Sequence, residues 1–425
     1  MREVARLKSL KVKFNSYTFE CSVKSGFIEG SRVQVYFLDN DDCFEKPDMF
    51  IYDRGTALLA HGALQLSILL NWIPDVIHCN GWRTAFIPYL LRNNQEYTGN
   101  FANTRVVLQL HDLENYETFP AAEAVETGLT EIVPGEKHPL VSNGDISILK
   151  PGMASSDGIL SSNLGNLRQQ IRTIYKGLRG IEKSFYEIPN GVDVKTWGPE
   201  HDKHLTQKFT CDDFIDGKAR NKAELFVELG FGEETQLPLV IVGSEREDEH
   251  SQAALRELLD KISQINCKMI ILGTHTPELE ELIRNKILEY PGKFSLEQKS
   301  DGFRHRVVGS ADIFLLPILN KDCEYYLVYS LMYGAVPIVV ETDISLEKIV
   351  PYSPKTGQGN GFLFEKDDFS GMLDSLRSVL KLYPDHNVWQ NLQSVCMQED
   401  FSWCRTAEQY IEYYESLVNS KSYSD

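Results

Sequence analysis

Residues 311–340 read ADIFLLPILNKDCEYYLVYSLMYGAVPIVV, and this stretch decides the fold. An apolar run at 313–316 predicts a strand, and apolar residues recur at helical spacing within 325–332. Gly334 stands where a left-handed residue closes a helix, and a second apolar run follows at 336–340. Strand, loop, helix and strand predict a βαβ unit with a right-handed crossover. Ligands of doubly wound sheets bind at the carboxyl ends of strands, so chemistry is expected in the polar loop before the helix.

Strand and helix patterns alternate along much of the remaining chain. Strands are expected at 33–38, 74–78, 105–110, 239–242 and 269–272, and helices at 56–70, 82–91, 253–265 and 278–287. This alternation is typical of parallel sheets with crossover helices, so the fold class is α/β. A length of 425 residues is enough for two or three domains.

Charge and cysteine usage exclude several classes of function. The formal net charge is −18, from 61 acidic against 43 basic residues, which disfavours nucleic acid and anionic membranes but not a neutral polysaccharide. The sequence has neither a signal peptide nor an apolar run long enough to span a membrane, so a cytoplasmic protein is expected. The eight cysteines are scattered without a CxxC pair, which favours reduced thiols over a disulfide framework or a zinc site. We therefore expect no metal and no cofactor.

The stretch at 311–340 also resembles a motif of the bacterial glycogen synthase and plant starch synthase family. That motif reads P-S-x-x-E-P-C-G-L-T-Q and then Y-G-x-x-P, and the chain keeps its Pro, Cys, Tyr, Gly and Pro as Pro317, Cys323, Tyr333, Gly334 and Pro337. Members are retaining glycosyltransferases that lengthen an α-1,4-glucan from a nucleotide-activated glucose. Further segments resemble family motifs in the same order, at 74–91, 106–120, 148–165, 176–202, 209–231, 357–365 and 401–417.

The resemblance implies a GT-B fold, in which two Rossmann-like, doubly wound parallel-sheet domains face a cleft. We expect an N-terminal domain at 1–205, a C-terminal domain at 206–400, and a helix at 401–425 that returns to the first domain. The family's opening strand and its Lys-x-Gly-Gly-Leu loop have no counterpart here. Three explanations remain open: the start is truncated, residues 7–12 replace the strand, or another chain covers the open sheet edge.

The resemblance also assigns candidate residues in the first domain. His111 corresponds to the family's active-site histidine that meets the glucose. His78, Trp82 and Asn190 match motif residues expected near the glucan cleft, where Asn80 replaces a second histidine. Each has a structural alternative, because strand-end histidines are commonly hydrogen-bonded and tryptophans commonly pack in cores. Asp157 and Asp193, also in shared motifs, are expected to be capping or turn residues.

The expected donor-binding positions depart from the family. Ser244 stands for the catalytic Arg, Glu249 for the Lys and Lys321 for the Glu, and Glu324 replaces a Gly whose backbone approaches the ligand; Cys323 is kept. A departing diphosphate needs cations, and a carboxylate in their place repels it by roughly 4 kcal/mol at about 4 Å and an effective dielectric constant of about 20. Arg246 could substitute for the lost Arg, although acidic neighbours surround it.

Two principal hypotheses follow, and a purely structural interaction module is a third. The chain is a catalytically impaired homologue kept for glucan binding or for regulation, with a true glycogen synthase as one candidate partner. Alternatively, it is an active glucosyltransferase that moves glucose from ADP-glucose to the non-reducing end of an α-1,4-glucan. Both hypotheses predict α-1,4-glucan as a partner and ADP-glucose or ADP as a second ligand.

Overall fold

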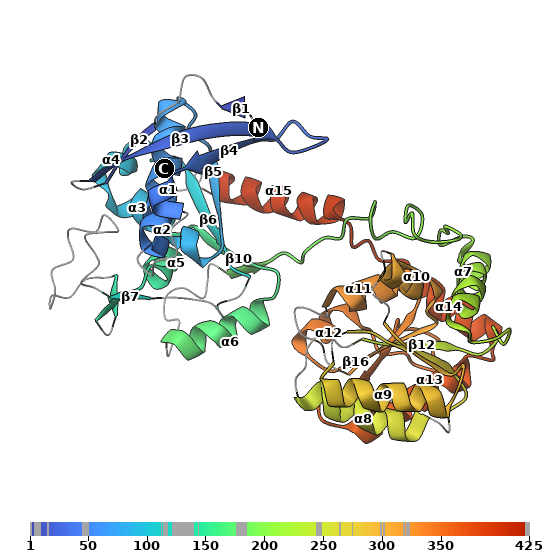
Figure 1. Cartoon of the computed structure of the whole chain (residues 1–425). Helices are drawn as coiled ribbons and strands as arrows, with labels where there is room; N and C mark the ends of the chain where they lie inside the picture. The colour runs from blue at the N-terminus through green and yellow to red at the C-terminus, as the bar shows by residue number, and fades with distance from the viewer. Residues whose placement is uncertain are drawn as a thin grey trace. The chain divides into compact units, whose positions relative to one another are not determined.

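A computed structural model describes residues 2–3, 10–14, 17–44, 51–111, 113, 118–120, 140–142, 144–175, 185–243, 249–262, 265–273, 275–297, 300, 302–317, 319 and 324–420. The chain divides into two compact units (Figure 1). Unit 1 comprises Met1–Asn190 and Glu408–Asp425, and unit 2 comprises Gly191–Ala407. The structure thus places residues 191–205 in unit 2, earlier than the boundary expected at 205, because Asp202 is hydrogen-bonded to His305 and Tyr333.

Unit 1 contains a four-stranded parallel sheet in the order β11-β10-β6-β5. Its strands are β5 (Val76–Asn80), β6 (Arg105–Gln109), β10 (Gly158–Ser161) and β11 (Phe185–Glu187). The register pairs Ile77 with Val106 and Leu108 with Ile159. All of β10 and most of β6 are buried, as expected for strands covered on both faces. The connections contain η1 (Trp82–Ala85), α3 (Phe86–Asn93), α4 (Gln95–Thr98), α5 (Leu149–Ser155) and α6 (Leu164–Tyr175).

A second sheet of unit 1 is antiparallel, and it corrects one expectation. The strand expected at 33–38 is β4 (Gln34–Asp39), which pairs with the eleven-residue β3 (Tyr17–Phe27) rather than joining the parallel sheet. The short sequence between them closes a hairpin, and a hairpin connection is antiparallel by geometry. The remaining elements of unit 1 are β1 (Arg2–Glu3), β2 (Leu10–Phe14), α1 (Asp41–Phe44), α2 (Ile51–Leu69), β7 (Phe119–Pro120), β8 (Val141–Ser142) and β9 (Asp145–Ile146).

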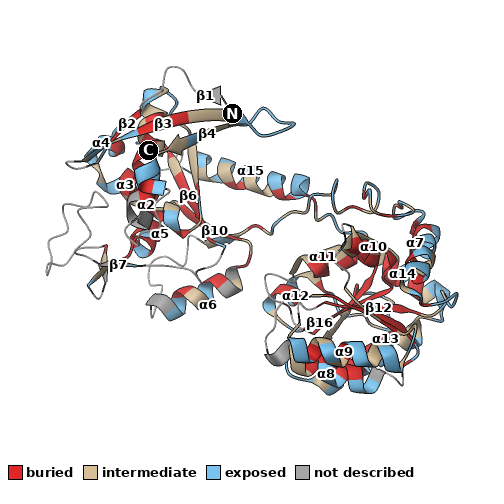
Figure 2. Cartoon of the chain, in the orientation of Figure 1, coloured by how far each residue is buried: buried red, intermediate tan, exposed pale blue. Residues whose placement is uncertain are grey.

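The parallel sheet of unit 1 ends at β5 in the described part of the chain. An open sheet edge is expected because the family's opening strand has no counterpart in the sequence. Among the described residues no strand pairs with the far side of β5. Residues 10–14 form β2 in the antiparallel sheet, so the described part of the 7–12 segment does not replace that strand. The residues of β5 are mostly half-buried, whereas those of β10 are buried (Figure 2). The edge position of β5 accounts for this difference.

Unit 2 is built on a six-stranded parallel sheet in the order β14-β13-β12-β15-β16-β17. Its strands are β12 (Leu239–Val242), β13 (Lys268–Ile271), β14 (Phe294–Leu296), β15 (Ile313–Leu316), β16 (Val336–Val340) and β17 (Phe362–Phe364). The strand order reverses between β12 and β15, which makes their carboxyl ends the topological switch point. The predicted βαβ unit is therefore confirmed as β15, α11 (Glu324–Met332) and β16. Gly334 adopts φ = 65°, the left-handed conformation expected after α11.

The other helices of unit 2 pack around this sheet. They are α7 (Phe214–Leu229), α8 (Glu249–Ile262), α9 (Pro277–Glu289), α10 (Phe303–Ser310), α12 (Asp343–Lys348), α13 (Phe369–Leu382) and α14 (His386–Cys396). The central strands are buried throughout, whereas the helices bury one face and expose the other (Figure 2). The last helix, α15 (Trp403–Asn419), packs Tyr413 against Val107 and Leu160 of unit 1. No helix in the described part of the chain has the length and apolarity needed to cross a bilayer.

Candidate active site

The carboxyl edge of the unit 1 sheet brings two predicted site residues together. Asn80 ends β5, and His111 follows β6, which is the next strand of the sheet. His111 Nε2 lies 2.9 Å from Asn80 Oδ1 and donates a hydrogen to it. Gly81 adopts φ = 82° directly after Asn80, which turns the chain into η1 at the sheet edge. His111 is exposed, and the hydrogen bond to Asn80 orients its ring.

His78 and Trp82 are committed to packing in unit 1. His78 Nδ1 is hydrogen-bonded to the hydroxyl of Tyr414, and its ring contacts that of Tyr410, both on α15. Burial lowers the pKa of His78. Trp82 is buried beneath the guanidinium of Arg83, which lies 4.7 Å from the ring centroid. These contacts favour the structural alternative for both residues.

The expected donor-binding positions follow β12 and β15 of unit 2 along the chain. A Cβ added to Gly243, just after β12, would lie 2.8 Å from Leu316 Cδ2, so the chain leaves β12 tightly against β15. Ser244 and Arg246 fall within 244–248, and Lys321 and Cys323 within 320–323; both ranges lie outside the described residues. The structure gives the backbone of Glu249 as the first residue of α8.

Glu324 is the donor-binding candidate whose side chain the structure places. It is the first residue of α11, and its Oε1 lies 3.0 Å from Nζ of Lys348, the last residue of α12. The side chains of Glu324 and Lys348 are only 21% and 9% exposed. A carboxylate at a helix N-terminus complements the helix dipole, so Glu324 already supplies the negative charge that this end of α11 favours.

Several motif residues that the chain shares with the family build the interior of unit 2. The Trp197 ring is stacked between His305, at 3.7 Å, and Tyr329, at 4.1 Å. Asp202 accepts hydrogen bonds from Tyr333 Oη at 2.7 Å and from His305 Nδ1 at 2.8 Å. These contacts attach Trp197 and Asp202 to unit 2, which favours a structural role for both residues.

Two lysines of the 209–231 motif are also buried, and each contacts an acceptor inside unit 2. Lys222 Nζ lies 2.5 Å from Asp312 Oδ2, and Lys218 Nζ donates to the backbone oxygen of Tyr333 at 2.8 Å. Burial lowers the pKa of Lys218 to about 8. Both amines are therefore bound to acceptors inside unit 2.

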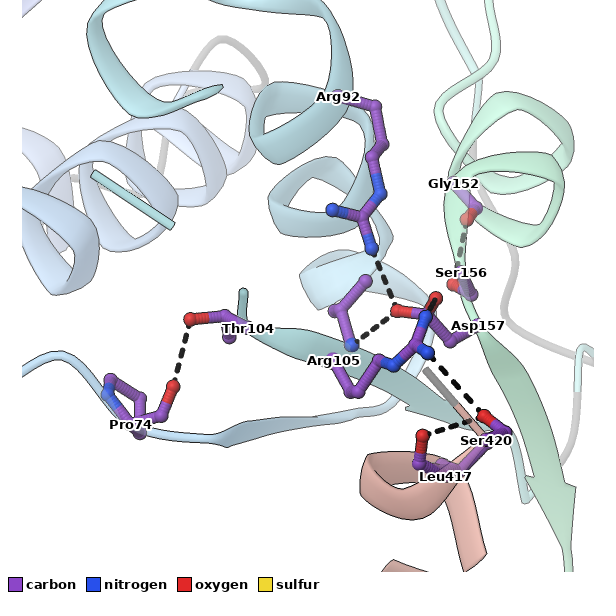
Figure 3. A network of polar contacts seen from close by, with 10 residues as sticks. Pro74, Arg92, Thr104, Arg105, Gly152, Ser156, Asp157, Leu417 and Ser420 are labelled. Atoms are coloured by element: carbon purple, nitrogen blue, oxygen red, sulfur yellow. Dashed lines mark hydrogen bonds and ion pairs between the residues drawn. The ribbon is translucent and has the colours of Figure 1, made fainter. Parts of the chain in front are cut away.

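Asp157 and Asp193 are both expected to be capping or turn residues, but their hydrogen-bond partners in the structure differ in kind. Asp193 accepts from Thr196 Oγ1 at 2.7 Å, as a turn residue does. Asp157 instead accepts from Arg92 Nη2 at 2.7 Å and Arg105 Nη1 at 3.0 Å (Figure 3). It therefore joins β6 and α3 through an ion-pair network, which its position before β10 did not indicate.

Comparisons with known proteins agree with this architecture. Residues 1–184 match the starch synthase catalytic domain family. Glycogen synthase from Clostridium perfringens (strain 13 / Type A) is 30% identical over 402 residues, covering 92% of this chain and 83% of the relative. Glycogen synthase from Koribacter versatilis (strain Ellin345) is 29% identical, covering 96% of this chain and 86% of the relative.

The chain belongs to the glycogen and starch synthase family. The catalytic domain of starch synthase IV from Arabidopsis thaliana, solved bound to ADP and acarbose, shares the fold, with a TM-score of 0.75 at 22% identity. That match covers 97% of this chain and 87% of the plant domain. The GT-B prediction is confirmed, and the chain is a glycogen or starch synthase-like glycosyltransferase.

The sequence patterns did not indicate that Lys348 pairs with Glu324. No periodicity connects residues 324 and 348, which lie on helices that follow two different strands of the sheet. The adjacent carboxyl ends of β15 and β16 bring the two helices together.

Asn190, the remaining cleft candidate, is exposed at the last position of the first segment of unit 1.

Proposed function

We propose that this chain is a glycogen or starch synthase homologue with impaired glucosyl transfer, retained to bind α-1,4-glucan or to regulate glycogen metabolism. The observation that carries the proposal is the ion pair between Glu324 and Lys348 at the switch-point edge of unit 2. The N-terminus of a helix at this edge is a common place for phosphate groups. Here a carboxylate of the chain itself takes that place.

Electrostatics explain why this arrangement opposes donor binding. A diphosphate about 4 Å from the Glu324 carboxylate is repelled by roughly 4 kcal/mol at an effective dielectric constant of about 20. Lys348 offers little compensation, because Glu324 already neutralises it. The expected replacements of Arg by Ser244 and of Lys by Glu249 would remove two further cations from the departing diphosphate.

Glucan binding is supported by the other unit. The hydrogen bond from His111 to Asn80 holds an exposed imidazole at the carboxyl edge of the unit 1 sheet. The acarbose in the plant relative supports a carbohydrate ligand for this chain, whereas its ADP supports a nucleotide ligand only under the alternative of an active enzyme. We extend the proposal to a cytoplasmic protein that acts beside a true glycogen synthase.

The alternative is an active glucosyltransferase that uses ADP-glucose. The His111–Asn80 pair favours it, because the histidine that resembles the family's active-site residue is present and oriented. In this case Arg246 would have to supply the charge lost at Ser244.

One experiment separates the two proposals. Purified protein is incubated with labelled ADP-glucose and glycogen, and binding of ADP and of a maltooligosaccharide is measured separately by calorimetry. We expect maltooligosaccharide binding without measurable transfer. Transfer within about tenfold of an ordinary glycogen synthase would overturn the impaired-homologue proposal, and absence of maltooligosaccharide binding would overturn the glucan-binding role.

A further inference from the structure

Unit 2 has a cavity at the amino edge of its sheet, opposite the edge where the donor site is expected. Its walls come from the segments that lead into β12 and β13 and from the C-terminal half of α13 with the residues after it. Its volume is about 470 Å³, within the range of roughly 300 to 1,000 Å³ typical of small-molecule sites. The cavity is therefore large enough for a ligand and is distinct from the donor edge.

The charge of this cavity is opposite to that of the chain. Among the described residues that line it, the charged ones are Arg377 and Lys381 and none carries a carboxylate, although the chain has 61 acidic and 43 basic residues. Arg377 and Lys381 are four residues apart, so they lie on one face of α13. Arg377 Nη1 pairs with Asp374 Oδ1 at 3.0 Å, but both side chains are about half exposed or more, and such pairs are weak. An anion in the cavity can therefore compete for the guanidinium.

The other lining groups suit a polyhydroxylated ring. The side-chain amides of Gln236 and Asn266 each offer donors and an acceptor, as hydroxyl groups require. Pro238 and Tyr383, which carry rings, also line the cavity. The Tyr383 hydroxyl accepts from Lys222 Nζ at 3.1 Å and lies 3.4 Å from Asp312 Oδ2, which fixes the ring in place.

We propose that this cavity binds a small phosphorylated sugar, with Arg377 and Lys381 holding the phosphate and Gln236 and Asn266 the hydroxyl groups. The two cations are placed to contact one phosphate group from a single helix face. Asp312, which lies 3.4 Å from the hydroxyl of the lining residue Tyr383, is paired with Lys222, so its charge is compensated. The proposal is independent of whether the chain transfers glucose, since it concerns the opposite edge of the sheet.

The test is calorimetric titration of the full chain with glucose 1-phosphate, glucose and inorganic phosphate as separate probes. We expect glucose 1-phosphate to bind at least tenfold more tightly than either glucose or inorganic phosphate. The double variant Arg377→Gln/Lys381→Gln should weaken that binding at least tenfold. Arg284→Gln is the matched control, because Arg284, like Arg377, is an exposed helix cation paired with a carboxylate of its own helix; it should leave binding unchanged.

Each other outcome contradicts the proposal. If inorganic phosphate binds as tightly as glucose 1-phosphate, the cavity does not recognise the sugar and that part of the proposal is wrong. Binding that survives the double variant but is displaced by ADP would place the probe at the donor site instead. Absence of binding by any probe would reject the site, while leaving the assay of glucosyl transfer unaffected. Because both substituted residues are exposed, circular dichroism should show the double variant folded like the parent.

Discussion

Glu324→Gln is the substitution that most directly tests the electrostatic argument. It removes the carboxylate at the start of α11 and leaves the Lys348 ammonium, 9% exposed, without its partner at 3.0 Å. Breaking a fully buried pair costs about 3–5 kcal/mol, and breaking an exposed pair costs less than about 1 kcal/mol. The partial exposure of Glu324 places the expected loss in unit 2 at about 2–3 kcal/mol.

The same substitution should create affinity for a diphosphate. With the carboxylate gone, both Lys348 and the N-terminus of α11 are available to an anion. ADP at about ten times its dissociation constant would return about 1.4 kcal/mol of stability. We therefore expect ADP at about 1 mM to stabilise the Glu324→Gln variant by at least that amount and to leave the parent protein nearly unchanged.

Hydrogen exchange of α11 peptides in increasing urea measures both effects in unit 2. Glu280→Gln is the control, because it breaks an exposed pair with Arg284 and should cost less than about 0.5 kcal/mol without any ADP response. If the parent protein is stabilised by ADP as strongly as Glu324→Gln, the Glu324–Lys348 pair does not obstruct the site and the reasoning fails.

Three further predictions concern the interior. Burial lowers the pKa of His61 from 6.5 to about 4, so the unfolded chain binds a proton at this residue more readily than the folded chain does. The free energy of unfolding of unit 1 should therefore fall by roughly 3 kcal/mol as the pH falls from 6.5 to about 4. The urea midpoint measures this loss, and it should depend less on pH in the His61→Phe variant. Lys222→Met should cost unit 2 about 3–5 kcal/mol in chemical denaturation, because the carboxylate of Asp312 is then buried without the ammonium that pairs with it, and adding Asp312→Asn should recover part of it. Gly158→Ala should cost about 1–3 kcal/mol in thermal unfolding, because the new methyl group overlaps the Tyr413 hydroxyl, and Tyr413→Phe should restore part of it.

Controls for these predictions come from the same chain. Gly99→Ala should be nearly neutral, because a Cβ there meets nothing within 4 Å and φ is −71°. Lys261→Met removes an exposed pair with Glu257 and should cost less than about 1 kcal/mol. A neutral Gly158→Ala variant, an undiminished pH dependence in His61→Phe, or a Lys222→Met loss no larger than that of Lys261→Met would each contradict the packing described.

Local sequence patterns predicted most of the fold. The 311–340 stretch gave strand, helix, left-handed Gly334 and strand where the structure has β15, α11 and β16. Periodicity could not distinguish β4 from a strand of the parallel sheet, because strand patterns do not encode which partner a strand takes. The sequence could predict only that His111 and Asn80 lie near each other, because the carboxyl ends of neighbouring parallel strands share one edge of the sheet. It could not predict their hydrogen bond.

The sequence by itself determined the α/β class and the family, and it predicts substitutions at the expected donor positions, because each depends on residue identity and on spacing along the chain. Only the tertiary structure decided which side chains are committed to one another. Glu324 meets Lys348, and Asp157 meets Arg92 and Arg105, across distances in sequence that no local pattern spans. Charge pairs of this kind depend on which elements the sheet order places side by side, and that order is set by packing of the whole unit.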